Sequence, residues 1–174
     1  MLDGVEVDLV ATEPLPVDAA DLPDDEGPRN FVLAHRWALE SASQLSIAVA
    51  DRFGSTVTRA DLMAAEPPAL LACKFGALAG RPSARQSKRE SDARDILELA
   101  RVLMRDRLLS ERYATAPFDL AELVRRNVER WMVDGATSFA RLVNLGADAS
   151  DERVEGSDVA DVAALLFAAL DGGA

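Results

Sequence analysis

The sequence lacks several features on which whole classes of protein depend. Its single cysteine, Cys73, cannot form an internal disulfide and cannot hold zinc by itself. No apolar run approaches the roughly 18 to 20 residues of a membrane span, and the first residues lack the basic-then-apolar order of a signal peptide. Neither a glycine-rich phosphate loop nor a Gly-x-Ser-x-Gly elbow is present. We therefore expect a cytoplasmic protein that has no membrane partner.

Residues that often carry catalysis are also scarce. His35 is the only histidine, so we expect a structural or surface role for it instead of a place in a triad. Cys73 stands beside Lys74, whose charge would lower the pKa of an accessible thiol. A lone cysteine in a helix is most often a small core residue, however, and this is the role that we expect for Cys73. Trp37 and Trp131 are expected to be packing residues.

Positive charge is in short supply as well. The chain has 30 Asp and Glu against 19 Lys and Arg, which gives a net charge of −11. This balance argues against a nucleic-acid coat or a membrane-surface binder, because both need a basic footprint. The charge is uneven, since residues 1–30 hold nine acids and one arginine, whereas residues 74–112 hold ten Lys and Arg against six Asp and Glu. A solvated helix face would explain such a basic run, so its meaning depends on spacing.

What is present suits one ordinary domain, or one domain with a small appendage: 174 residues, 49% hydrophobic and 28% charged. The expected elements, in chain order, are a strand over 5–10, an acidic proline-rich loop over 13–30, a helix over 31–43, a hairpin of strands 45–49 and 55–58, and helices over 67–79, 87–108, 117–131, 138–145 and 158–170. The helix over 87–108 would begin with a capping box, Ser87 to Glu90. Strands followed by helices predict an α+β fold, divided into a sheet region (1–66) and a helical region (67–174).

One of only two lysines occupies a costly position. Lys74 lies in the most apolar part of the helix expected over 67–79. Such a lysine either extends its ammonium to the surface or directs it at an anion. Arg81 follows seven residues later, nearly two turns on, which would place the two cations on one face roughly 10 Å apart. Two cations in a row suit an elongated polyanion such as a triphosphate.

Acidic residues on the next helix offer the opposite charge. Asp92 and Asp95 are three positions apart, so they are neighbours on the helix surface. Asp92 is in register with the apolar stripe that contains Ile96 and Leu99, and an acid on a buried face requires a cation. Either aspartate alone could simply be an ordinary partner for the helix dipole. It is their combination with Lys74 and Arg81 that indicates a functional site.

A third group of acids lies near the N-terminus. Glu6 and Asp8 alternate with valines, which places both carboxylates on one face of the strand expected over 5–10. Paired carboxylates of this kind hold Mg²⁺, although a solvent-facing strand edge has the same pattern.

Taken together, these residues resemble a known family. Lys74 and Arg81 have the Lys-x6-Arg spacing, and Asp92 and Asp95, with Lys88 before them, have the Asp-x-x-Asp spacing, of the abortive-infection type nucleotidyltransferase-like proteins, which include toxins of bacterial toxin–antitoxin systems. The resemblance extends from about residue 5 to residue 108. It implies a polymerase-β-like nucleotidyltransferase core followed by a helical part that binds the nucleotide phosphates.

The resemblance also implies roles for single residues. Asp8 would match the family's third carboxylate strand and act as a base or, with Glu6, as a ligand of Mg²⁺. Lys74 and Arg81 would contact the triphosphate of an NTP. Asp95, and Asp92 with it, would complete the site. Transfer of a nucleotidyl group needs metal and cations for the phosphates and a carboxylate near the attacking hydroxyl.

The chain departs from the family at its start. The Gly-Ser and Asp-x-Asp motif of the family should precede the Asp8 strand, where Glu6 alone mimics the acid pair. We expect this chain to be the C-terminal part of a longer protein, with a reduced, inactive form as the alternative.

Two functions therefore follow from the sequence. The first is a nucleotidyltransferase-like protein that uses an NTP and Mg²⁺ and transfers a nucleotidyl group to an RNA acceptor. It would act as a toxin, and a cognate antitoxin protein would oppose it. The second is a non-catalytic interaction module, either a degenerate nucleotidyltransferase domain or a toxin–antitoxin partner. The module would dock its partner on the Ala/Leu-rich helix over 158–170 and would bind no nucleotide.

Overall fold

The computed structural model describes residues 22–51, 53–106, 108, 111–147 and 152–171. In chain order, its elements are α1 (Glu26–Glu40), β1 (Ser43–Ala50), β2 (Thr56–Ala64), α2 (Pro67–Gly80), the 3-10 turn η2 (Ser83–Arg85), α3 (Gln86–Arg105), the 3-10 turn η3 (Arg112–Thr115), α5 (Phe118–Asn127), the π-helix η4 (Val128–Asp134), α6 (Ala136–Leu145) and α7 (Gly156–Asp171). The expected α+β class is confirmed: the described part is mostly helical and has one two-stranded antiparallel sheet.

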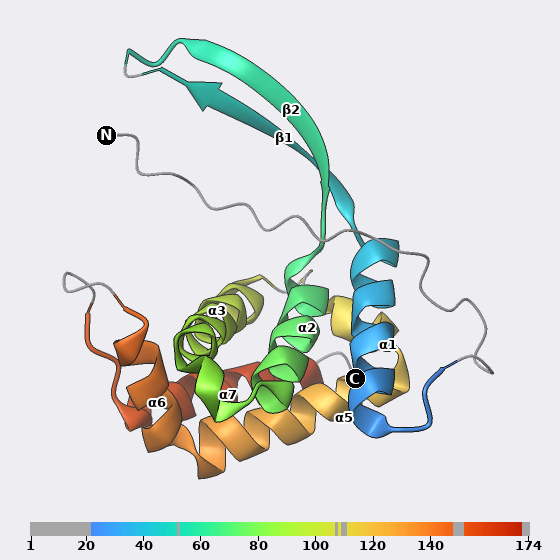
Figure 1. Ribbon diagram of the computed structural model, residues 1–174, viewed down its shortest axis with the longest axis vertical. Coiled ribbons are helices and arrows are strands. Elements are labelled where there is room, and N and C mark those ends of the chain that lie inside the picture. The colour runs from blue at the N-terminus through green and yellow to red at the C-terminus, as the bar shows by residue number, and fades with distance from the viewer. Residues whose placement is uncertain (1–21, 52, 107, 109–110, 148–151, 172–174) are drawn as a thin grey trace.

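The helices form one body from which the β1–β2 hairpin projects (Figure 1). Helix α2 lies at the centre of this body, where it packs against α1, α3 and α5. Helix α3 packs in turn against α6 and α7. Helix α1 precedes the hairpin and packs on α2, so elements from both sides of residue 66 share one core. The predicted division of the chain into a sheet region (1–66) and a helical region (67–174) remains a prediction.

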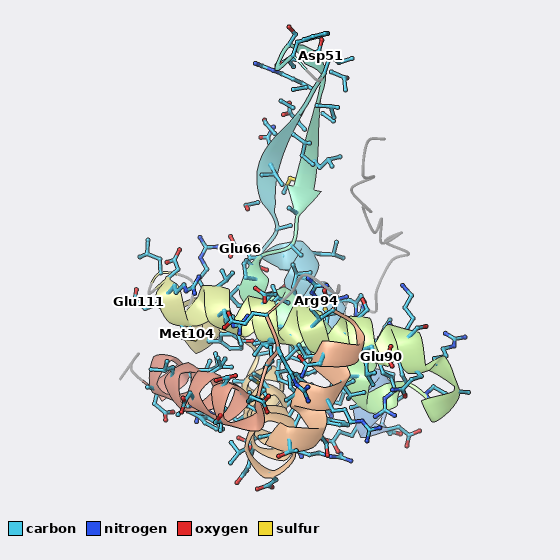
Figure 2. All side chains as sticks on the ribbon, turned by 90° about the vertical axis from the view of Figure 1, so that its left-hand side faces the viewer. Asp51, Glu66, Glu90, Arg94, Met104 and Glu111 are labelled. Carbon is cyan, nitrogen blue, oxygen red and sulfur yellow. The ribbon has the colours of Figure 1, made fainter. Side chains whose placement is uncertain are left out.

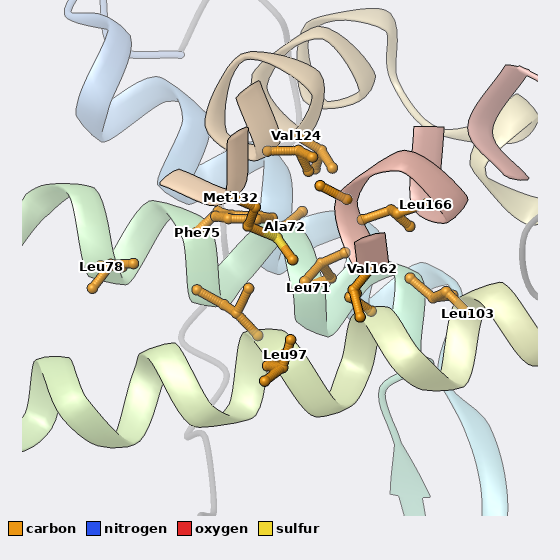
Figure 3. Close-up of a cluster of buried hydrophobic side chains, with 14 of the residues drawn as sticks. Leu71, Ala72, Phe75, Leu78, Leu97, Leu103, Val124, Met132, Val162 and Leu166 are labelled. Atoms are coloured by element: carbon orange, nitrogen blue, oxygen red, sulfur yellow. The ribbon is translucent and has the colours of Figure 1, made fainter. Parts of the chain in front are cut away.

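The core is built from leucine, valine and aromatic side chains of α2, α3, α5, α7 and η4 (Figure 3). Phe75 and Leu71 of α2 are fully buried, as are Leu97 of α3 and Leu166 of α7. Full burial of one such side chain stabilises the fold by about 1.5 to 3 kcal/mol relative to exposure. Leu166 belongs to the apolar stripe of α7, which packs inside the body. The docking of a partner on this helix, whose Leu165 is exposed, remains a prediction.

Helix α2 begins and ends where the sequence predicts. Pro67 and Pro68 occupy its first turn, where their missing N–H groups cost nothing. The helix ends at Gly80, because Arg81 adopts an extended conformation and Pro82 follows it.

Helix α3 begins differently from the expectation. It starts at Gln86, directly after η2, and no side chain caps its N-terminus. The predicted capping box from Ser87 to Glu90 is therefore wrong. The Glu90 carboxylate instead accepts a hydrogen bond from the Gln86 side chain at 3.0 Å, one helical turn away. The helix ends at Arg105, three residues before the predicted exit.

The predicted loop over 13–30 is also corrected in its last part. Residues Glu26 to Asn30 form the first turn of α1, with Pro28 tolerated there because first-turn N–H groups have no partner in the helix. Residues 1–21, which contain the strand expected over 5–10, lie outside the described part of the chain.

The predicted hairpin is confirmed, and its second strand is longer than expected. Strand β2 extends to Ala64 because it pairs with β1 along its whole length, from Ser43 opposite Ala64 to Ala50 opposite Thr56. At the tip, Asp51 Oδ1 accepts hydrogen bonds from the N–H groups of Phe53 and Ser55, at 2.8 and 2.9 Å. Gly54 has a φ of +82°, a conformation that suits glycine. Figure 2 shows that the labelled Asp51 lies far from the helical body.

The helix expected over 117–131 is longer than predicted and changes from an α-helix to a π-helix. Helix α5 ends at Asn127 and continues as the π-helix η4 to Asp134, where Gly135 follows. A Cβ atom on Gly135 would lie 2.9 Å from the carbonyl oxygen of Arg130, so only glycine fits this close approach. The turn at Gly135 then leads into α6.

Candidate functional site

Four charged residues singled out in the sequence meet on adjacent elements. Lys74 on α2 lies beside Asp92 and Asp95 on α3, with its Nζ 3.4 Å from Asp92 Oδ1 and 2.6 Å from Asp95 Oδ2. Arg81 Nε lies 2.5 Å from Asp92 Oδ2. We call these four residues the charge cluster.

The two cations are arranged differently from the expectation. A helix through both would have placed Lys74 and Arg81 in a row on one face, but α2 ends at Gly80. Arg81 belongs to the extended connection that leads to α3, so its side chain turns toward the same carboxylate that Lys74 contacts. The cations therefore converge on Asp92 instead of presenting a line of positive charge.

Asp92 is the buried centre of the cluster. Only 2% of its side chain is exposed, because its position on α3 is in register with the buried Ile96 and Leu103. A buried carboxylate is costly unless it is paired and hydrogen-bonded, and here both carboxylate oxygens face a cation. The prediction that an acid on this buried stripe requires a cation is confirmed.

Lys74 and Asp95 form the open side of the cluster. The exposed fraction is 27% for the Lys74 side chain and 42% for that of Asp95. Burial alone would lower the pKa of Lys74, but the hydrogen bond to Asp95 and the negative charges of Asp95 and Asp92 outweigh it. The pKa of Lys74 therefore lies above its ordinary value, and the ammonium stays charged at neutral pH.

The cluster is balanced in formal charge, with two cations and two carboxylates. An incoming anion must therefore replace a carboxylate. Asp95 is the one that can be replaced at low cost, since a partly exposed ion pair contributes only about 0 to 1 kcal/mol. Separating Asp92 from its cations would cost several times more, because its charge is buried.

The other predicted site residues are distributed as follows. Glu6 and Asp8 lie outside the described residues, so their proposed part in catalysis and metal binding remains a prediction. Within the described ranges, no group of three acids, histidines or cysteines is arranged to hold a metal ion. Asp92 and Asp95 face cations, an arrangement that does not fit a Mg²⁺ site.

The sequence predicts structural roles for His35 and Cys73, the two other residues whose types often take part in catalysis. His35 Nδ1 lies 2.8 Å from the Phe31 carbonyl oxygen, one turn back on α1. Burial raises the pKa of the Cys73 thiol to about 11, and the nearby Lys74 charge offsets this only in part. The expectation of a core role for Cys73 therefore agrees with its surroundings better than that of an activated thiol.

A second ion pair, of a buried glutamate with an exposed arginine, was not predicted. Glu66, which directly precedes α2, is buried and pairs with Arg112 of η3. The pair lines a pocket of about 270 Å³ together with Trp37 and Pro68 at the base of the hairpin. The Tyr113 hydroxyl donates a hydrogen bond to the Pro68 carbonyl oxygen at 2.9 Å. Tyr113 and Pro68 are 45 positions apart in the chain, so no local sequence pattern predicts that they lie together.

Trp131 has a partly polar environment in addition to its packing role. The guanidinium groups of Arg130 and Arg89 lie 5.4 and 6.0 Å from its ring centroid. Both distances fall within the range of cation–π attraction.

Comparison of the chain with protein-family models, with curated proteins and with solved structures gave no match. Within the described ranges, every helix is too short or too polar to cross a lipid bilayer.

Proposed function

We propose that this chain belongs to a nucleotidyltransferase-like protein in which the charge cluster binds the triphosphate of an NTP. The observation that carries the proposal is the meeting of Lys74 and Arg81 at one surface, with 27% of each side chain exposed, beside a carboxylate that can be displaced. On this proposal the protein transfers a nucleotidyl group to an RNA acceptor in the cytoplasm, and a cognate antitoxin protein opposes it. The helical body would follow a polymerase-β-like core.

Within the proposal, Lys74 is the residue that changes partner. Its ammonium is held by the half-exposed Asp95, and a triphosphate carries more negative charge than one carboxylate. Arg81 stays with the buried Asp92 and thereby keeps the end of α2 in place against α3. Lys74 would then stabilise the charge that develops on the departing pyrophosphate.

The metal part of the proposal depends on Glu6 and Asp8. A bound Mg²⁺ ion supplies charge neutralisation at the phosphates. Since the carboxylates of the charge cluster are already paired with cations, Glu6 and Asp8 are the residues of this chain that would hold the ion. Asp8 would also accept the proton of the attacking hydroxyl.

The test is the binding of each of the four NTPs to the full chain, measured by calorimetry with and without Mg²⁺. The variant Lys74→Ala is expected to weaken binding by at least tenfold, because it removes the exchangeable cation. Lys88→Ala is the matched control, since Lys88 is the other lysine and lies exposed on α3. Circular dichroism and thermal unfolding establish that each variant folds. Equal affinity in the wild type and Lys74→Ala would refute the assignment of Lys74.

A second candidate function is the non-catalytic interaction module. The observation that favours it is the formal balance of the cluster, which lets the four residues act simply as a connection between α2 and α3. A module of this kind would bind none of the four NTPs even in the wild type, with or without Mg²⁺. Wild-type binding therefore separates the two functions before any variant is made.

A further inference from the structure

Positive charge gathers at the N-terminal end of α3. Arg85 ends η2, and Lys88 and Arg89 follow in the first turn of α3, where Glu90 is the next acid. Residues three and four positions apart are neighbours on a helix surface, so the three cations lie side by side. Arg85 and Lys88 are exposed, and Arg89 is half-buried. Part of the basic run noted in the sequence therefore has the spacing of a single surface.

The three cations are not neutralised by neighbouring acids. None of the acids in the described ranges forms an ion pair with Arg85, Lys88 or Arg89. Glu90 accepts a hydrogen bond from the Gln86 side chain, and it adjoins the end of α6, where a Cβ on Gly146 would lie 3.2 Å from the Cβ of Glu90. Unlike the cations of the charge cluster, those at this end of α3 are available to an external anion.

An aromatic ring adjoins this basic end. The guanidinium carbon of Arg89 lies 6.0 Å from the ring centroid of the half-buried Trp131, which belongs to η4. Within the described ranges, Arg89 Nε and Trp131 Nε1 have no hydrogen-bond acceptor. A donor in this state costs free energy, which the oxygen of a bound ligand would recover.

The two elements contribute different chemistry. On η4 the acids Glu129 and Asp134 outnumber Arg130, so this element adds no net positive charge. It supplies the ring of Trp131 instead, and the end of α3 supplies the charge. We call Arg85, Lys88, Arg89 and Trp131 the basic–aromatic surface.

We propose that the basic–aromatic surface binds a single-stranded RNA, with phosphates on the cations and one base against the Trp131–Arg89 pair. The choice of RNA rests on the proposed function, in which RNA is the acceptor. Proteins that bind single strands combine cations that follow the backbone with aromatic rings on which bases stack. A duplex keeps its bases stacked on one another and would leave the ring unused. An acidic polypeptide could pair with the cations but offers no base to the ring.

The basic–aromatic surface continues into the charge cluster. Asp92 follows Lys88 by four positions and Arg89 by three, so it lies one turn farther along the same side of α3, a rise of about 5.4 Å. Lys74 and Arg81 meet at Asp92. An RNA strand on the surface would therefore have one end beside the proposed triphosphate site. Transfer of a nucleotidyl group requires the acceptor and the NTP to be held together in this way.

The first test measures the charge contribution. Binding of a fluorescent oligouridine of about ten nucleotides to the full chain is followed by anisotropy, without NTP or Mg²⁺, over a series of salt concentrations. Arg85→Gln should reduce the slope of log affinity against log salt by about 0.7, the value for one phosphate contact on a single strand. At about 50 mM salt the affinity should fall roughly five- to tenfold.

Arg105→Gln is the matched control for the charge. Arg105 is exposed on the last turn of the same helix, about 25 Å from Lys88, and it forms no ion pair with an acid of the described ranges. Its loss should leave both the affinity and the salt slope unchanged. A loss equal to that of Arg85→Gln would overturn the placement of the RNA.

The second test measures stacking on the ring. The chain has two tryptophans, so Trp37→Phe leaves Trp131 as the sole indole reporter. Oligouridine should change the fluorescence of Trp131 in this variant. Trp131→Leu should weaken binding roughly fivefold or more and leave the salt slope unchanged, because stacking releases no counterions. Circular dichroism and thermal unfolding establish that the variants fold, and the exposed Arg85 provides a test that does not disturb packing.

Four results would overturn the inference. The first is an affinity for oligouridine that is the same in the wild type, Arg85→Gln and Trp131→Leu. The second is an absence of any binding by the wild type. The third is displacement of oligouridine by an equal concentration of polyglutamate of the same length, which would make an acidic polypeptide the occupant. The fourth is tighter binding of a single-stranded DNA of matching sequence.

The outcome is separable from that of the proposed function. NTP binding that depends on Lys74, together with no RNA binding, would refute only the basic–aromatic surface. RNA binding that depends on Arg85 and Trp131, together with no NTP binding, would support the surface and refute the proposed triphosphate site.

Discussion

Arg81 Nε lies 2.5 Å from Asp92 Oδ2, and this contact joins the residue just after α2 to the buried face of α3. The carboxylate is 2% exposed, whereas the arginine is 27% exposed. The acid is thus the member of the pair that cannot find water if its partner is lost. This asymmetry determines how the cluster should respond to substitution.

Asp92→Ala should destabilise the protein by about 2 to 4 kcal/mol. The variant leaves two cations without their shared partner, and the estimate is moderate because both side chains reach solvent. Asp95→Ala should cost about 1 kcal/mol or less, because the pair that it breaks is half exposed. Urea unfolding of both variants tests the order. Equal losses would mean that Asp92 is not the centre of the cluster.

The sequence predicted the members of this cluster because their chemistry is local. A lysine amid apolar residues and an aspartate on an apolar helical stripe each demand a partner, wherever the chain places it. The convergence of Lys74 and Arg81 on Asp92 was not predictable, because it depends on the direction that the chain takes after Gly80 and on its return as α3. The Glu66–Arg112 pair was not predicted from the sequence either, because only tertiary packing brings these two residues together.

The prediction of helices and strands has the same limit, because it depends on local sequence patterns. The apolar spacing of α2 and α7 predicted both helices to within a few residues, because that spacing repeats with the period of the helix. In the second half of β2 the alternation of polar and apolar residues runs only from Arg59 to Leu62 and is broken by Met63, so the extended form of the strand depends on pairing with β1. The π-helix η4 also lacks a local signal, although Gly135 at its end marks the tight turn.

The Cys73 thiol should titrate at high pH in the folded protein. Burial raises its pKa from an ordinary 9.0 to about 11, so the folded state holds the thiol proton more tightly than the unfolded state does. The resulting stabilisation is complete below pH 9 and is lost as the pH rises toward 11. The rate of alkylation between pH 8 and 11 should rise with a midpoint near 11 when folded and near 9 in urea. A folded midpoint below 9 would show instead that the Lys74 charge dominates.

Two glycines should respond in opposite directions to the same substitution. Gly135→Ala should destabilise the protein by about 1 to 3 kcal/mol, because the new Cβ would lie 2.9 Å from the backbone oxygen of Arg130, which has little freedom to move. Gly76→Ala is the matched control within α2, where a Cβ would meet nothing within 4 Å. Alanine there should stabilise the helix by about 0.5 to 1 kcal/mol, since glycine loses more backbone entropy on folding.

Thermal unfolding of the two glycine variants beside the wild type provides the measurement. For a chain of this size, 1 kcal/mol corresponds to a shift in Tm of about 2 to 4 °C. Gly135→Ala should therefore melt below the wild type by about 2 to 12 °C, and Gly76→Ala should melt above it by about 1 to 4 °C. An unchanged Tm for Gly135→Ala would mean that the turn between η4 and α6 relaxes to admit a side chain, which would remove the steric reason for glycine at that position.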